Sequence, residues 1–334
     1  MEPFEKNLTR RDFLSRSAAV AAAAALSGSL PACSDTTEPS ERTKTAAKPG
    51  VPQRTLGKTG LRVSILSFGG GGLFLVNPDG QWEAMLEQAL TGGINLFDTC
   101  SCYELAGTKP SEERYGEILS PRRRSLMIST KFDARTSDEA AVEVERSLRR
   151  LRTDYVDILL MHHIKSTDDL AVIEQGAYRR LVQLKAEGVA RFIGFSSMSS
   201  AAKSKELLEN LDFDVVMLAL NPTQYGDYAR TVLPVARAKD VGVIAMKVMS
   251  NLVGVSATAK ELLEYAWTLD FVSSAVIGQF GTEMQQENIG LAMEFRKNGS
   301  SMKDRSVLET RLAPLAGPHA LCWARPDYRD GAPV

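Results

Sequence analysis

Eight short apolar runs recur along residues 65 to 278, and longer amphipathic segments separate them. Short apolar runs bounded by turn signals are typical of strands that are buried on both faces, and the segments between them have helical periodicity. Two of the predicted helices span 139–151 and 177–188, and the second ends at Gly188, a residue type that commonly ends helices. The predicted strands span 65–70, 94–98, 126–131, 156–162, 190–196, 214–220, 242–247 and 273–278. Eight such strand and helix units predict an α/β fold, a closed parallel (β/α)8 TIM barrel.

An open doubly wound sheet is the alternative arrangement of the same units. That sheet would need a glycine-rich phosphate-binding turn after the first strand. The run GGGGLF at 69–74 places Phe74 where the third glycine belongs, if Gly69 and Gly71 are the first two. The barrel is therefore favoured. We also expect a short hairpin turning at 58–60 before it.

The chain beyond residue 298 is predicted to be an appendage of the barrel. Residues 302–315 have a helical pattern, and residues 317–334 form a tail that contains proline and aromatic residues. Residues 299–334 are therefore expected to form a helix and a tail, and the tail could fold over one barrel mouth.

The first 33 residues are typical of a targeting segment rather than of a folded domain. Arg10 and Arg11 precede Phe13 and Leu14, and an alanine-rich stretch too short to span a membrane follows. This segment resembles a twin-arginine export signal, so we expect export to the periplasm. A disordered, mildly basic arm is the alternative interpretation.

The residues after the signal determine how the protein would be held at a membrane. Leu30-Pro31-Ala32-Cys33 resembles a bacterial lipobox, in which Cys33 would carry a lipid. Residues 34–51 are polar and predict a disordered tether, with the barrel over 52–298. Apart from a lipid on Cys33, we expect no contact with a membrane.

The overall composition indicates small-molecule partners. A net charge of -1 provides no basic surface for nucleic acid. Four scattered cysteines are too few for a disulfide framework or a paired zinc motif. The sequence predicts neither a resident metal nor a particular oligomer, and a monomer or a small oligomer would fit.

Polar residues end or follow three of the predicted strands. Asp98, Lys131 and His162 end the second, third and fourth strands, and Tyr103 lies in the loop after Asp98. In a (β/α)8 barrel these strand ends converge on one mouth. A buried ammonium held by an aspartate would lower the pKa of a neighbouring tyrosine toward working pH. That tyrosine could protonate a carbonyl oxygen as hydride reaches the carbon, while an imidazole holds the same oxygen.

With these residues in place, the chain from about Arg54 to Asn288 resembles the aldo-keto reductase family. The matching segments are GINLFDTCSCY (93–103), STK (129–131), DILLMH (157–162), IGFSS (193–197) and IGQFGTEMQQEN (277–288). The resemblance implies a catalytic tetrad of Asp98, Tyr103, Lys131 and His162, with Tyr103 as general acid. His162 is preferred to His163 because the family's histidine falls five residues after the strand aspartate, here Asp157.

The resemblance also implies a nicotinamide cofactor, NADP or NAD, bound across the barrel mouth without a Rossmann domain. Ser196 and Ser197 match the pair that holds the carboxamide, and Glu287 and Asn288 match residues on the adenine side. The full set of implied cofactor residues is Gly70, Asp98, Ser196, Ser197, Met217, Met246, Lys247, Gly278, Gln279, Met284, Glu287 and Asn288.

Three positions depart from the usual family pattern. Met217 stands where glutamine commonly contacts the carboxamide, and Met246 stands where many members stack a tyrosine on the nicotinamide. Gly278, Gln279 and Met284 stand at the 2'-phosphate end, where lysine or arginine is common. Without a cation there, the preference for NADPH loses its usual electrostatic basis, so cofactor choice stays open.

The sequence therefore predicts an NAD(P)H-dependent oxidoreductase that acts on an aldehyde, a ketone or a sugar-like carbonyl. A nicotinamide-binding redox sensor or accessory subunit with little turnover is the alternative. Cys100 and Cys102 are interpreted as small residues at positions where alanine or serine would serve. In an oxidising compartment, one of them could instead be linked to Cys322.

Overall fold

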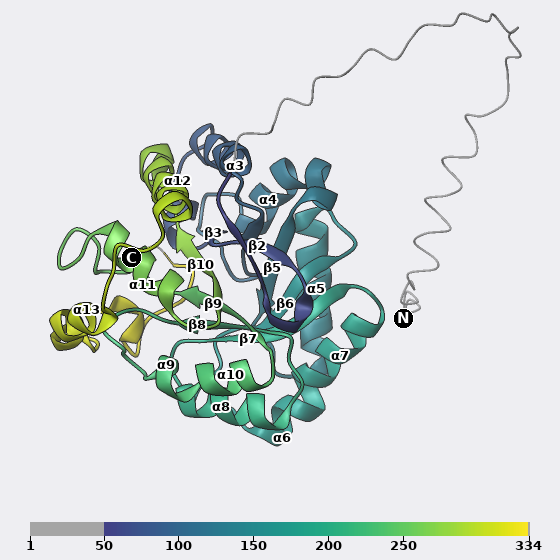
Figure 1. The fold of residues 1–334 in the computed structure, drawn as a ribbon. Helices are drawn as coiled ribbons and strands as arrows, with labels where there is room; N and C mark the ends of the chain where they lie inside the picture. The colour runs from purple at the N-terminus through teal and green to yellow at the C-terminus, as the bar shows by residue number, and fades with distance from the viewer. Residues whose placement is uncertain (1–49, 333–334) are drawn as a thin grey trace, which may run out of the picture. The chain divides into compact units, whose positions relative to one another are not determined.

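The structure, a computed structural model, describes residues 50–332, and its main feature is a closed barrel of eight parallel strands (Figure 1). Each strand pairs with the next along the chain, and the last pairs with the first. The strands are β3 (Leu66–Gly69), β4 (Leu96–Asp98), β5 (Met127–Phe132), β6 (Val156–Met161), β7 (Ala190–Ser197), β8 (Val215–Ala219), β9 (Gly242–Met246) and β10 (Val272–Gly278). The predicted (β/α)8 barrel is confirmed, and the doubly wound alternative is wrong.

Helices that follow the strands surround the barrel, as Figure 1 shows. They are α2 (Gly72–Leu75), α3 (Gln81–Gly92), α4 (Ser111–Leu119), α5 (Ser137–Leu151), α6 (Leu170–Ile173), α7 (Arg179–Ala186), α8 (Ala201–Asn210), α9 (Tyr228–Thr231), α10 (Leu233–Ala238), α11 (Ala259–Thr268) and α12 (Gly281–Asn298), with a 3-10 helix η3 (Ser120–Ser125). Helix α5 illustrates why they form. The Thr136 side chain caps its first turn by accepting from the Glu139 backbone N–H, and Ala140, Val144 and Leu151 face the core at helical spacing.

The helix predicted at 177–188 begins earlier than its periodicity suggested. Helix α6 is capped by the Asp169 side chain, and a π-helical turn, η4 (Glu174–Tyr178), joins it to α7. Gly188 lies just past the helix end with a φ of 73°, as its position predicted. The start was missed because a π turn shifts the phase of the apolar positions.

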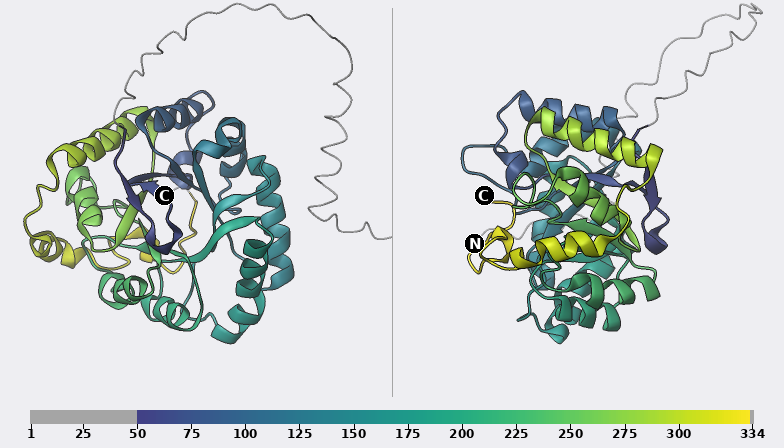
Figure 2. Two further views of the ribbon diagram at one scale, coloured as in Figure 1. Left: turned by 45° about the vertical axis from the view of Figure 1, so that its right-hand side comes forward. Right: turned by 60° about the vertical axis from the view of Figure 1, so that its left-hand side comes forward.

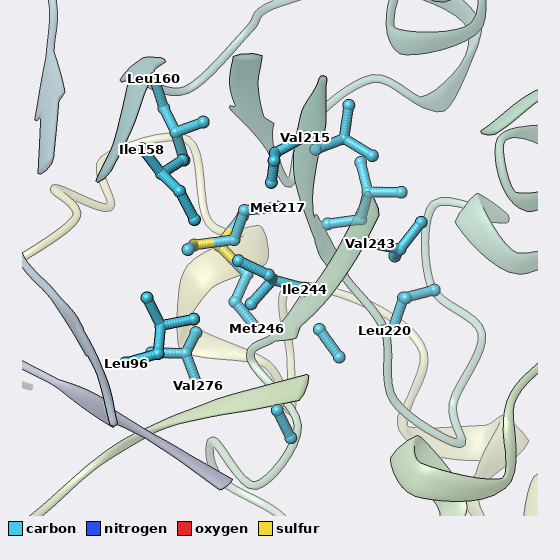
Figure 3. Close-up of a cluster of buried hydrophobic side chains, with 14 of the residues drawn as sticks. Leu96, Ile158, Leu160, Val215, Met217, Leu220, Val243, Ile244, Met246 and Val276 are labelled. Atoms are coloured by element: carbon cyan, nitrogen blue, oxygen red, sulfur yellow. The ribbon is translucent and has the colours of Figure 1, made fainter. Parts of the chain in front are cut away.

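Alternating side chains of the strands fill the barrel interior. Figure 3 shows apolar side chains from β4, β6, β8, β9 and β10 pointing toward one another, and they are buried. Those pointing inward include Leu96, Ile158, Leu160, Met217, Ile244, Met246 and Val276. The same alternation points Asp98 and His162 inward, because they lie two positions beyond the inward-facing Leu96 and Leu160; Lys131 reaches Asp98 from the neighbouring strand β5.

The two ends of the barrel are covered by different parts of the chain, which Figure 2 shows on opposite sides. A hairpin of β1 (Gln53–Thr55) and β2 (Arg62–Ser64), joined through η2 (Gly57–Thr59), lies at the amino ends of β9 and β10. Arg54 fixes it there by donating to the carbonyls of Trp267 and Val272. The predicted hairpin is confirmed.

The chain after α12 first runs along α11 and then reaches the opposite end of the barrel, where Tyr328 and Asp330 line the mouth. It contains helix α13 (Arg305–Leu312) and the 3-10 turns η5 (Ala313–Leu315) and η6 (Cys322–Ala324).

Across residues 50–332, no helix combines the length and the apolar character that crossing a bilayer requires.

Residues 1–49 and 333–334 lie outside the described part of the chain. The predicted twin-arginine signal, the lipobox at Cys33 and most of the tether fall there. The last tether residue, Val51, does not behave as a tether: it is buried, and its N–H donates to the Gly92 carbonyl. The fold therefore already includes Val51.

Candidate active site

The four residues predicted as a tetrad meet at the carboxyl end of the barrel. Asp98 ends β4, Lys131 lies in β5, His162 directly follows β6, and Tyr103 lies in the loop between β4 and α4. All four are buried, with exposed fractions between 1% and 6%. The convergence that the fold predicted is therefore present.

Lys131 and Asp98 form a buried ion pair. The ammonium donates to Asp98 Oδ2 at 2.6 Å and to the Thr99 carbonyl at 2.8 Å. Burial opposes the ammonium charge, yet attraction to Asp98 raises the pKa of Lys131, which keeps it charged. The other oxygen, Asp98 Oδ1, is buried without a hydrogen-bond partner, so this carboxylate has an acceptor left for a ligand.

The pKa of Tyr103 is shifted in the opposite direction from the one that the sequence predicted. Lys131 Nζ lies 5.0 Å from the centre of the Tyr103 ring, but it is the aspartate that holds the ammonium. Burial, followed by Asp330 and Asp98, raises the pKa of Tyr103 well above its usual range. The expected lowering of this pKa is therefore wrong in this arrangement, and Tyr103 is a neutral hydroxyl that donates a hydrogen bond.

The C-terminal tail places a carboxylate in the centre of the site. Asp330 Oδ2 accepts from the Tyr103 hydroxyl at 2.9 Å and lies 2.9 Å from His162 Nε2. Asp330 Oδ1 accepts from Lys247 Nζ at 2.5 Å and from the Tyr328 hydroxyl at 3.1 Å. Burial opposes its charge, but Lys247 and His162 hold the pKa of Asp330 well below the usual range.

The next residue fixes the tail against the tyrosine. Gly331 has a φ of 84°, and a Cβ at this position would lie 2.1 Å from Tyr103 Cδ1. A Cβ at Gly71 would lie 3.6 Å from Tyr103 Cε2 and 3.8 Å from Gly331 Cα, so the two glycines lie next to each other beside the ring. Both glycines thus leave room for Tyr103, and the tail covers the mouth, as the sequence suggested.

The two adjacent histidines have different surroundings. His162 has Nδ1 3.1 Å from Asp133 Oδ1 and Nε2 facing Asp330. Burial opposes a charge on this ring, but Cys100, Asp133 and Asp330 raise the pKa of His162 well above its usual range. His163 points elsewhere, and burial and His162 lower its pKa to about 4. The choice of His162 agrees with this geometry.

A cavity of about 340 Å³ opens beside the cluster. The predicted residues that line it are Asp98, Tyr103, Met217, Met246, Lys247, Gly278 and Met284. A second cavity of about 520 Å³ shares Met249, Val253 and Met284 with the first and extends to Glu287 and Asn288. The two cavities together offer an elongated path from the catalytic cluster to the adenine-side residues, which fits an extended dinucleotide.

Four predicted cofactor residues lie behind the cavity wall instead of lining it. Gly70 packs against Ser111 and Tyr115, so closely that a Cβ would meet the Ser111 hydroxyl at 2.3 Å. The other three are Ser196, Ser197 and Gln279. The Ser196 hydroxyl accepts from the His163 N–H, and the Ser197 hydroxyl forms a hydrogen bond with the Tyr228 hydroxyl. The side-chain oxygen of Gln279 accepts from the Asn288 side chain. Gln279 Nε2 is buried without a partner, so an unused donor remains near the adenine end.

The three cysteines of the described chain, Cys100, Cys102 and Cys322, are all free thiols. The disulfide that an oxidising compartment could form between Cys322 and Cys100 or Cys102 is therefore absent from the described chain. Cys100 and Cys102 instead lie beside His162, at 3.4 and 3.5 Å from Nδ1.

Sequence reasoning missed two carboxylates of the site, Asp133 and Asp330. Asp133 directly follows β5, so the rule that strand ends converge would have found it. Asp330 had no such signal, because its position depends on how the tail folds. Of the aromatic residues in the tail, Tyr328 lines the cavity, whereas Trp323 is buried against Tyr225.

Comparisons with known proteins agree with this fold. The Aldo/keto reductase family model matches residues 66–266. L-galactose dehydrogenase from Arabidopsis thaliana is 27% identical over 307 residues, which cover 78% of this chain and 94% of that protein. D-threo-aldose 1-dehydrogenase from a Pseudomonas species is 30% identical over 225 residues, covering 58% of this chain and 68% of that protein.

Solved structures show the same architecture. An aldo-keto reductase from Pseudomonas aeruginosa aligns with a TM-score of 0.61 at 27% identity, covering 72% of this chain and 95% of that one. The holo form of an aldo-keto reductase from Bacillus halodurans aligns with a TM-score of 0.63 at 21% identity, covering 80% and 96%, and supports the fold alone. The chain belongs to the aldo/keto reductase family and is an NAD(P)-dependent oxidoreductase.

Proposed function

We propose that this protein moves hydride between a nicotinamide cofactor and the carbonyl carbon of an aldehyde, ketone or sugar-like substrate, with Tyr103 as general acid. One observation carries the proposal: Tyr103 and His162 Nε2 both lie 2.9 Å from the same oxygen, Asp330 Oδ2. Two groups that converge on one oxygen are what a carbonyl oxygen needs when it gains negative charge. In this proposal the carbonyl oxygen of the substrate binds at the position that Asp330 Oδ2 now occupies.

Each residue of the tetrad has a separate role in the proposed reaction. Tyr103, kept neutral by its surroundings, gives its hydroxyl proton to the substrate oxygen in the reducing direction. The phenolate left behind faces the Lys131 ammonium, which stabilises it. His162 Nε2 orients the oxygen, and Asp98 holds Lys131 in place.

The cofactor, when bound, supplies or accepts the hydride. Met217 and Met246 line the cavity next to Asp98 and would cover the nicotinamide ring with their thioethers. Glu287 and Asn288 would hold the adenine end. Among the described residues that line the two cavities, only Lys247 carries a positive charge, and Asp330 already pairs with it. We therefore propose NAD or NADP without preference.

The sugar-like substrate class is supported by relatives and by the mouth itself. Both relatives named above are dehydrogenases named for sugars. The cavity wall next to the tetrad carries Ser250, Asn251 and Tyr328, whose polar groups could bind hydroxyls.

The direct test is turnover by the purified protein with NADH or NADPH and a panel of aldehydes and aldoses. Tyr103→Phe should lower kcat by about 10²- to 10⁴-fold, because it removes the acid and leaves the ring. Tyr155→Phe serves as the matched control, since that ring packs on Arg123 away from the site. Full turnover by Tyr103→Phe would overturn the assignment.

A nicotinamide-binding sensor or accessory subunit is the second candidate, and Asp330 favours it. A carboxylate that occupies the substrate position would keep turnover low. Tight nucleotide binding with negligible turnover in every variant would support this function.

We also propose that the protein is exported by the twin-arginine route and anchored by a lipid on Cys33, which lies outside the described residues. Replacing Arg10 and Arg11 by lysine should retain the protein in the cytoplasm in cell fractionation.

A further inference from the structure

Four side chains with metal-binding atoms, one of them His162, form a cluster at the ends of neighbouring strands. Cys100 and Cys102 come from the loop after β4, Asp133 from the end of β5, and His162 from the end of β6. One atom from each lies within 4.8 Å of all the others. From the sequence, Cys100 and Cys102 are interpreted as small residues without a ligand role. The fold brings an imidazole nitrogen and a carboxylate to them.

We propose that these four residues bind a zinc ion through Cys100 Sγ, Cys102 Sγ, Asp133 Oδ1 and His162 Nδ1. Zinc prefers four ligands in a tetrahedron, and two thiolates with one imidazole select it over magnesium or calcium. Binding replaces the two thiol protons and any proton on Nδ1, and these pass to solvent.

The distances are close to those of such a centre. With metal bonds of 2.0 to 2.3 Å, neighbouring ligand atoms of a tetrahedron are about 3.3–3.8 Å apart. His162 Nδ1 lies 3.4 Å from Cys100 Sγ, 3.5 Å from Cys102 Sγ and 3.1 Å from Asp133 Oδ1. The two sulfurs, 2.7 Å apart, must separate by about 1 Å. A side-chain rotation of the half-buried Cys102 can supply this movement.

The main chain of the loop is already fixed in place. The Ser101 N–H donates to the Lys131 carbonyl, and Arg150 donates to the Ser101 carbonyl. Since Ser101 stands between the two cysteines, these bonds hold both ligands near the strand ends. The site therefore needs little reorganisation to bind an ion.

Groups behind the ligands complete the arrangement. Glu143 accepts from the Ser101 hydroxyl and from the backbone N–H of Asp133, which positions two of the three ligand-bearing segments. Asp330 faces His162 Nε2, and a carboxylate on the far nitrogen of a metal-binding histidine fixes the ring. The Asp133 side chain is 52% exposed and gives an ion access from solvent, while Cys100 is buried.

Such an ion would affect the reaction only by fixing which nitrogen of His162 carries the proton. This effect rests on the proposed function. Metal on Nδ1 leaves the proton on Nε2, the nitrogen that faces the substrate position. His162 would then always present an N–H to the carbonyl oxygen. The ion positions this residue and does not touch the substrate.

The test uses the full chain, purified with reductant, stripped with a chelator and titrated with Co²⁺ alone in the absence of substrate. We expect one cobalt per chain, an absorption band from thiolate-to-cobalt charge transfer, and loss of that band when Zn²⁺ is added. Cys102→Ser should weaken binding by at least about tenfold. Cys322→Ser is the matched control, since that thiol lies outside the cluster, and it should bind as the parent does.

Asp133→Asn provides a second variant on an exposed side chain in case Cys102→Ser does not fold, and it should also weaken binding. The proposal is overturned if folded protein shows no thiolate band, or if Cys102→Ser and Asp133→Asn bind as tightly as the parent. A disulfide between Cys100 and Cys102 in protein purified with zinc would overturn it as well. Because metal binding is measured without substrate, these outcomes are independent of the turnover assay for Tyr103.

Discussion

Removing the Asp330 carboxylate should open the active site and lower the apparent KM for small aldehydes. In the closed arrangement, the carboxylate contacts Tyr103, His162 and Lys247, and its side chain is 6% exposed. A carbonyl oxygen cannot reach Tyr103 and His162 until this carboxylate leaves. Substrate therefore binds only the fraction of molecules in which the tail is open.

The size of the effect follows from these contacts. Hydrogen bonds to charged partners contribute about 1.5–3 kcal/mol each, and Asp330 makes them with Lys247 and His162. Ordering the tail offsets part of this, at about 1–2 kcal/mol for each fixed residue. A net preference of about 2 kcal/mol for the closed tail corresponds to about thirtyfold. The apparent KM is raised by the same factor, so Asp330→Ala should lower it by roughly ten- to thirtyfold.

The assay is steady-state oxidation of reduced nicotinamide with a short aldehyde, in the parent and three variants. Gly331→Ala should act in the same direction, because the added Cβ would clash with the Tyr103 ring and displace the tail while Asp330 is kept. Asp327→Ala is the control, as this aspartate lies in the same tail and is exposed. A fall in kcat with unchanged KM in Asp330→Ala would refute the reasoning and make Asp330 a participant in the reaction.

Three further outcomes are expected. Lys131→Met leaves Asp98 buried and unpaired and should lower the free energy of unfolding by about 3–5 kcal/mol in urea, whereas Lys58→Met, at an exposed pair with Asp212, should cost less than about 1 kcal/mol. Glu264→Gln replaces an oxygen that accepts from the backbone of Ser301 and Met302, so it should cost about 1–3 kcal/mol and speed proteolysis between α12 and α13; unchanged cleavage would contradict this role. Met284→Arg should raise the preference for NADPH over NADH by about tenfold in kcat/KM, while Met293→Arg, on the same helix but outside both cavities, should leave the ratio unchanged.

The strands and the tetrad could be predicted from the sequence because each depends on local patterns. Strands buried on both faces are nearly continuous apolar runs, and a polar residue at the end of such a run, as at Lys131, stands out against them. Once the barrel is inferred, its geometry brings these ends together.

The features that the sequence did not reveal depend on long-range placement. Asp330 is an ordinary aspartate in a polar tail until the tail folds over the mouth, where burial together with this carboxylate raises the pKa of Tyr103 instead of lowering it. The thiols of Cys100 and Cys102 become part of a cluster of metal-binding atoms only when Asp133 and His162 lie beside them. In each case the partners come from segments far apart along the chain, so the spacing within one segment does not reveal the contact.

The loop that carries Cys100 and Tyr103 continues the hydrogen-bond ladder of the barrel past the end of β4. The Thr99 N–H donates to the Ser129 carbonyl, and the Ser101 N–H donates to the Lys131 carbonyl. We therefore expect the amide protons of Thr99 and Ser101 to exchange with deuterium about as slowly as those of the strands, unlike those of an ordinary surface loop. A segment protected in this way opens only with the barrel itself, so lost protection would report opening of the barrel.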